Sequence, residues 1–115
     1  MDNNNRRRYE RFPFYESVAI QKKTDEAAEG SLSEDISQSG LKLNVNEFIP
    51  LNTVLELQIH FPGKVSLVNA QAKVVWVRES PKSIDAWQIG LEMIDQNSSL
   101  PDIENYIRLQ RFKLF

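Results

Sequence analysis

Three stretches in which apolar and polar residues alternate constrain the fold of this 115-residue chain most. Apolar residues occupy every second position at 55–61, 68–76 and 87–93, and most residues between them are polar. A period of two belongs to a β-strand with one buried side and one side that faces solvent. The three stretches therefore predict amphipathic strands rather than helices.

Shorter apolar runs between turn residues predict further strands. These strands are expected near 15–22, 31–36 and 41–43. A hairpin loop fits 22–30, and Gly40 suits a turn at 37–40 where a positive φ is favoured. About six short antiparallel strands separated by turns indicate a mainly β protein, either a small barrel or a sandwich.

The pattern changes near the C-terminus. Ser99, followed by Asp102 three residues later, resembles a capping box with Asp in place of Glu or Gln, and Pro101 suits a first helical turn. Apolar residues at helical spacing follow, and they predict a helix of about three to four turns over one open end or edge of the sheet. We expect one domain, made of a flexible basic arm (1–12), a β-barrel (13–97) and a C-terminal helix (98–115).

Composition argues against catalytic and metal-binding functions. The chain has no cysteine and one histidine, His60, which lies on the polar phase of a predicted strand. A zinc site or a nucleophile–base pair would lack its usual residues, so we expect His60 to be a surface residue. The four scattered glycines do not form a phosphate-binding loop. We therefore predict a protein that is not an enzyme and that has no cofactor or metal.

The N-terminal residues and the lengths of the apolar runs indicate where in the cell the protein is expected. The first residues are polar and basic, which is not the pattern of a secretory signal. The longest apolar runs are far shorter than a membrane span, so no membrane insertion is expected. A cytoplasmic protein is the default interpretation.

A cluster of arginines precedes the first apolar run. Residues 1–12 hold four arginines against Asp2 and Glu10, a formal charge of +2, whereas the whole chain carries −2, so residues 13–115 sum to −4. Guanidinium groups bind phosphates in a bidentate way, stack on purine rings and pair with the O6 and N7 atoms of guanine. A solvated basic tail is the commonest role of such a cluster, and an anion site is the alternative.

A second motif runs from Asp35 to Gly40. Asp35 and Ser37 alternate with Ile36, so we expect both of their side chains to point outward. A carboxylate can accept both donors of a guanine edge, a serine hydroxyl can bind a phosphate, and a glycine admits close approach. An ordinary turn at the end of a strand would use the same residue types.

Together these motifs resemble the PilZ domain, a family of bacterial receptors for cyclic dimeric GMP. The matching residues are Arg7-Arg8-Tyr9-Glu10-Arg11 and Asp35-Ile36-Ser37-Gln38-Ser39-Gly40, with later strands at 72–76 and 89–93. The resemblance covers about residues 6–95. It implies a six-stranded antiparallel barrel with a C-terminal helix and a flexible N-terminal arm, acting in second-messenger signalling.

The resemblance also implies residue roles. Arg7 and Arg11 would clamp guanine edges and phosphates, and Asp35 would read the donor edge of a guanine. Ser37 would contact the ligand and Gly40 would leave room for it. An arginine at position 6 accompanies binding of two intercalated ligand molecules in this family. Trp76 stacks on a guanine in some members, although its phase with Val74 favours a place in the core.

The leading hypothesis is a non-enzymatic cyclic di-GMP effector whose arm becomes ordered over the barrel and changes the surface offered to an unidentified protein partner. The alternative is a PilZ-like adaptor that binds a protein and no nucleotide. A nucleic-acid-binding module that uses the basic arm is disfavoured by the acidic body, so neither DNA nor RNA is expected.

Overall fold

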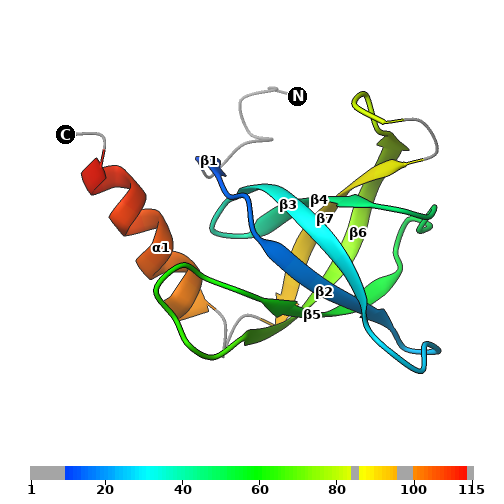
Figure 1. Cartoon of the computed structure of the whole chain (residues 1–115), viewed down its shortest axis with the longest axis horizontal. Coiled ribbons are helices and arrows are strands. Elements are labelled where there is room, and N and C mark those ends of the chain that lie inside the picture. The colour runs from blue at the N-terminus through cyan, green and yellow to red at the C-terminus, as the bar shows by residue number, and fades with distance from the viewer. Residues whose placement is uncertain (1–9, 84–85, 96–99, 114–115) are drawn as a thin grey trace.

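The computed structural model describes residues 10–83, 86–95 and 100–113 (Figure 1). The strands are β1 (Phe12–Pro13), β2 (Ser17–Lys22), β3 (Glu29–Ile36), β4 (Gly40–Val45), β5 (Val54–Ile59), β6 (Val68–Glu79) and β7 (Trp87–Asp95), and the helix is α1 (Leu100–Lys113). Most of the expected basic arm, Arg6 and Arg7 included, lies outside the described residues.

The sheet closes on itself to form a barrel. Its strands follow the order β3-β2-β5-β6-β7-β4, and β4 pairs back with β3 through Leu41 opposite Ile36. β1 adds a short outer strand, with Phe12 opposite Ile36. The predicted six-stranded antiparallel barrel with a C-terminal helix is confirmed. β1 was not predicted, because two residues are too few to show a period.

Alternation directs the apolar side chains into the barrel. Leu55 and Leu57 on β5 are at most 1% exposed, whereas Glu56 between them is exposed. On β6, Ala70 and Ala72 also point inward and are 5% and 0% exposed. Closure leaves little room inside, so small side chains on one strand make space for the larger aliphatic residues of its neighbours.

α1 lies beside the loop that joins β5 to β6 (Figure 1), where Lys64 Nζ is 2.7 Å from Asp102 Oδ1. Ile103 and Ile107 are 0% and 6% exposed. The ring of Tyr106 packs edge-on against Phe14 with centroids 4.9 Å apart, and its hydroxyl donates a hydrogen bond to the backbone oxygen of residue 13 at 2.9 Å. The helix thus covers one end of the core and contacts the segment that directly follows the N-terminal arm.

This docking can be tested by truncating Ile103. Ile103→Ala should lower the free energy of unfolding by about 2–4 kcal/mol, because it removes fully buried atoms and leaves a cavity. Leu109→Ala is the control on the same helix, since Leu109 is 49% exposed, and it should cost less than about 1 kcal/mol. Urea unfolding measures both, and equal losses would contradict docking through Ile103.

Candidate functional site

The side chain of Arg11 joins the two predicted motifs. Its Nε donates to Asp35 Oδ1 at 2.7 Å, and its Nη2 lies 2.6 Å from the same oxygen. Its Nη1 donates to Ser37 Oγ at 3.3 Å. The pairing of β1 with β3 explains this meeting, because it holds Phe12 opposite Ile36 and so brings Arg11 beside the end of β3.

Ser37 stabilises the turn between β3 and β4. Its Oγ accepts a hydrogen bond from the backbone N–H of Gly40 at 3.1 Å, and its own N–H donates to Gly40 O at 2.9 Å. The side chain is 2% exposed, so the expectation that it points outward to solvent is wrong. The hydroxyl is buried because it accepts hydrogen bonds from backbone N–H groups of its own turn. Arg11 is the side chain that reaches it from outside.

Gly40 is required by a backbone contact. A Cβ at this position would lie 2.7 Å from the carbonyl oxygen of Leu91 on β7, and 3.7 Å from Arg11 Nη1. The first distance is too short for any side chain, whereas the second is an ordinary contact. The glycine therefore lets β4 approach β7 directly beneath the guanidinium group of Arg11.

Substitution of Gly40 should accordingly be costly. Gly40→Ala should destabilise the fold by about 1–3 kcal/mol, because β7 must move to admit the methyl group. Gly30→Ala is the control, since nothing lies within 4 Å of a Cβ there, and it should change stability by less than about 0.5 kcal/mol. Urea midpoints compare the two, and equal effects would contradict the steric role.

Trp76 lies on the outside of the barrel. It is 37% exposed, and the pairing of β6 with β7 shifts register between Val74 and Trp76. The core position favoured by its phase with Val74 is therefore wrong, because the irregularity adds one residue and reverses the alternation. A Cβ on Gly90, opposite Trp76, would overlap the five-membered ring of the indole, so this ring lies directly against the backbone of β7.

A polar network covers the outer face next to Asp35. The carboxylate of Glu34 accepts hydrogen bonds from Gln88 Nε2 at 2.7 Å and from Asn44 Nδ2 at 3.0 Å. It also lies 3.4 Å from Lys42 Nζ and 3.2 Å from Lys82 Nζ. Lys42 Nζ is in turn 3.9 Å from Asp35 Oδ2, which links this network to the Arg11 cluster.

Sequence reasoning missed Gln88 and Arg78. Gln88 occupies a polar position of the alternating stretch 87–93, which normally faces solvent, and Arg78 lies beyond the end of the stretch 68–76. Gln88 is nevertheless 1% exposed, and its Oε1 accepts a hydrogen bond from Arg78 Nε at 2.8 Å. The sequence does not show that Gln88 is covered by side chains on adjacent strands, because the register of the strands decides which side chains are its neighbours.

The network lowers the pKa of Glu34 to about 2. Burial by itself raises this pKa, but the hydrogen bonds from Asn44 and Lys82 and the charge of Lys42 favour the ionised form more strongly. The carboxylate therefore stabilises the folded state above its ordinary pKa of 4.5, and that contribution is lost as the pH falls from there through about 2.

This pKa shift predicts an acid-dependent loss of stability. Between neutral pH and strong acid, Glu34 should lose on the order of 1–2 kcal/mol of stabilisation, a figure reduced for partial solvent screening. Glu34→Gln should remove that part of the pH dependence. Urea unfolding at a series of pH values should show wild type and variant converging in acid, and a constant difference would contradict the shift.

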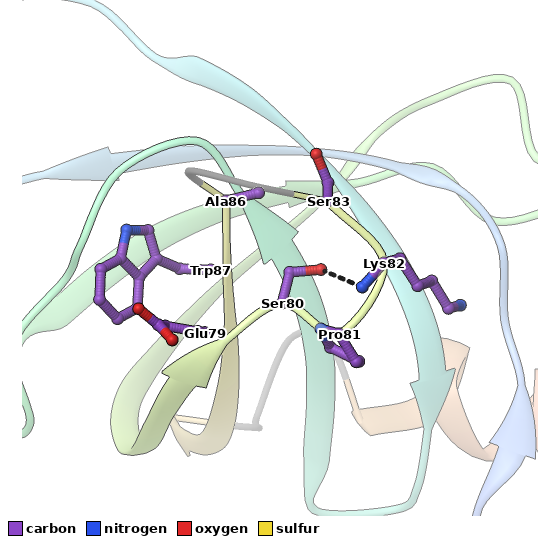
Figure 2. A pocket seen from close by; sticks show the side chains of 7 residues that line it. All are labelled: Glu79, Ser80, Pro81, Lys82, Ser83, Ala86 and Trp87. Atoms are coloured by element: carbon purple, nitrogen blue, oxygen red, sulfur yellow. Dashed lines mark hydrogen bonds between the residues drawn. The ribbon is translucent and has the colours of Figure 1, made fainter.

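Two cavities lie away from the Arg11 cluster. One, of about 490 Å³, surrounds the loop between β6 and β7 and is lined by residues that include Glu79, Lys82 and Trp87. Figure 2 shows this loop, in which the N–H of Lys82 donates to Ser80 Oγ at 3.2 Å. The other cavity, of about 620 Å³, adjoins it across β2, β3 and β4. Among the predicted site residues that the structure describes, none lines either cavity.

The position of His60 agrees with the sequence analysis. His60 is exposed, and its Nδ1 lies 2.9 Å from Glu16 Oε1, as expected for a surface residue. In residues 10–83, 86–95 and 100–113, no group of three or more His, Cys, Asp or Glu is arranged to hold a metal ion. Within the same residues, no helix has the length and apolarity needed to cross a membrane.

Comparison with known proteins identifies the fold family. The family model of the PilZ domain matches residues 5–109. This chain belongs to the PilZ domain family. The match spans both motifs, the barrel and most of α1. A search of curated protein sequences finds no match.

Solved structures share the PilZ fold at low sequence identity. The Bacillus subtilis inhibitor of motility MotI (DgrA) aligns with a TM-score of 0.72 and 23% identity, over 93% of this chain and 52% of that protein. The Escherichia coli YcgR PilZ domain, solved with c-di-GMP, aligns with a TM-score of 0.68 and 16% identity, over 95% of this chain and 97% of that domain. This chain thus spans about half the length of MotI and nearly all of an isolated PilZ domain.

Proposed function

We propose that this PilZ protein is a non-enzymatic receptor for cyclic di-GMP. The observation that carries the proposal is the meeting of Arg11 with Asp35 and Ser37, which unites the two sequence motifs in one cluster. The YcgR PilZ domain of similar fold was solved with c-di-GMP, which supports the same ligand class here. Arg6 and Arg7, outside the described residues, are proposed to complete the site from the arm.

The chemistry of the cluster suits a guanine nucleotide. The carboxylate of Asp35 can accept the N1 and N2 hydrogens of one guanine. The guanidinium groups of Arg7 and Arg11 can bind phosphate oxygens or the O6 and N7 atoms of a second guanine. Gly40 has no side chain, so it leaves space for a ligand next to Arg11. Trp76 offers a further flat surface, and Arg6 favours two intercalated ligand molecules.

Arg11 and the ligand would compete for the carboxylate of Asp35. Both nitrogens of Arg11 that face Asp35 contact its Oδ1. The N1–C2–N2 part of guanine is itself a guanidine-like fragment with the same pair of donors. Binding would therefore exchange one charge-assisted contact for another and release Arg11 toward the phosphates. Such an exchange keeps the cost of opening the ion pair small.

Signal output is proposed to pass through residues 10–12, at the end of the arm that joins the barrel. Glu10, next to Arg11, has its Oε1 3.2 Å from Arg111 Nη2 on α1, and the guanidinium carbon of Arg111 lies 5.9 Å from the centre of the Phe12 ring. A change at Arg11 would thus alter contacts with the end of α1, where Phe112 is 69% exposed. We propose that this surface meets a protein partner in the bacterial cytoplasm.

Calorimetric titration with cyclic di-GMP tests the site. Wild type should bind with a micromolar or lower Kd at physiological salt. Arg7→Ala, Arg11→Ala and Asp35→Ala should each weaken binding by at least about tenfold, or about 1.4 kcal/mol, because each removes a charged partner of the ligand.

Matched controls remove the same charges elsewhere. Arg108→Ala and Asp102→Ala alter α1 residues that contact Asn105 and Lys64, outside the cluster, and both should keep Kd within about twofold. Tight binding that survives the three site substitutions would refute the site assignment. A chain that shows no saturable binding but captures a protein partner would instead be the nucleotide-independent adaptor.

A further inference from the structure

Arg78 lies next to Trp76 on the outer surface of the barrel. The indole of Trp76 lies against the backbone of Gly90, and the Cζ atom of Arg78 lies over that ring at 5.4 Å from its centroid. Trp76 and Arg78 are two residues apart on β6 and both are exposed. Two flat groups, the guanidinium of Arg78 and the indole of Trp76, are therefore accessible to a molecule from solvent.

Gln88 holds this guanidinium in place. Its Oε1 accepts from Arg78 Nε at 2.8 Å, while its Nε2 donates to Glu34 Oε2 at 2.7 Å and to Asn44 Oδ1 at 3.0 Å. The amide is thus fixed at both ends and is 1% exposed. Fixing Nε leaves the Nη groups of Arg78 as donors and restricts the orientation of the guanidinium plane.

The charge of Arg78 is not neutralised by a neighbouring carboxylate. Among the described residues, no Asp or Glu lies within ion-pair distance of Arg78, whereas Arg11 and Arg111 pair with Asp35 and Glu10. Arg78 instead contacts a neutral amide and an aromatic ring. A fixed guanidinium on an exposed face with no anion of its own is suited to bind one.

Arg78 and the Arg11 cluster share one face of the barrel. Asp35 pairs with Lys42, Lys42 with Gly90, and Gly90 with Trp76, which makes a row across four adjacent strands. At roughly 4.8 Å between neighbouring strands, Asp35 and Trp76 are about 14 Å apart along this row. The indole reaches back over Gly90, which shortens the gap to about 10 Å. A dinucleotide with two purines can extend across such a distance.

We propose that Arg78 is a further ligand-contacting residue of the nucleotide site and that Gln88 is its positioning residue. This inference rests on the proposed cyclic di-GMP function. The guanidinium plane stacks on one guanine of the ligand, above the Trp76 ring, while its in-plane Nη donors face a phosphate oxygen. Asp35 and Arg11 then hold the ligand's other end.

The test compares three arginine variants by calorimetry with cyclic di-GMP. Arg78→Ala should weaken binding by about tenfold or more, and Arg78→Lys should recover little of that loss, because lysine restores the charge but not the plane. Arg108→Ala removes one arginine charge from α1 and should change Kd by less than about twofold. Urea unfolding of each variant checks that Arg78, an exposed residue, does not act through stability.

The positioning role of Gln88 is tested by a double-variant cycle. Gln88→Leu should weaken binding in the wild-type background but have no further effect in the Arg78→Ala background, because its role passes through Arg78. Equal losses in the two backgrounds would mean that Gln88 acts only on the fold and would overturn its assignment.

The outcomes separate this inference from the function on which it rests. Wild type that binds, together with Arg78→Ala that binds within about twofold of wild type, overturns the role of Arg78 alone and leaves it as a cover for Trp76. A wild-type chain with no saturable binding overturns the proposed function and this inference together.

Discussion

Closure of the barrel through β4 is the constraint on which the rest of the structure depends. β4 pairs with β3 on one side and with β7 on the other, so the turn at 37–40 must return the chain directly into the closing strand. Gly40 permits this by letting the carbonyl of Leu91 approach its Cα, and Ser37 satisfies the polar groups of the turn. A motif that suits ligand binding is therefore also a structural element of the closure.

The same closure assembles the outer face. Strands that are distant in sequence become neighbours, so Glu34, Asn44 and Gln88 meet across β3, β4 and β7. The inner face is mainly apolar, although Ser31 and Ser33 of β3 are also buried, and most other polar side chains interact with one another outside. Burial of the Glu34 carboxylate raises its pKa, but the hydrogen bonds from Asn44 and Lys82 and the charge of Lys42 lower it by more, so the group remains ionised.

The fold was largely predictable because its signals are local. Alternation on β5, β6 and β7 located three strands, and the residues after Ser99 located the helix. Arg11 and Asp35 were identified from motif spacing, and the structure brings them together. The phase of Trp76 was predicted wrongly because a register irregularity between Val74 and Trp76 leaves no trace in the hydrophobic pattern. The exposure of Ser37 was also predicted wrongly, since turn geometry buries it.

By itself, the sequence determined the strands, the helix, the residue types of the two motifs and the charge contrast between arm and body. These features depend on side-chain period and on spacing along the chain. Only the tertiary structure decided that Gln88 is buried, that Arg78 lies over Trp76, and that Gly40 faces the backbone of β7. The physical reason is that cross-strand register in a closed sheet brings together residues whose separation in sequence carries no record of the contact.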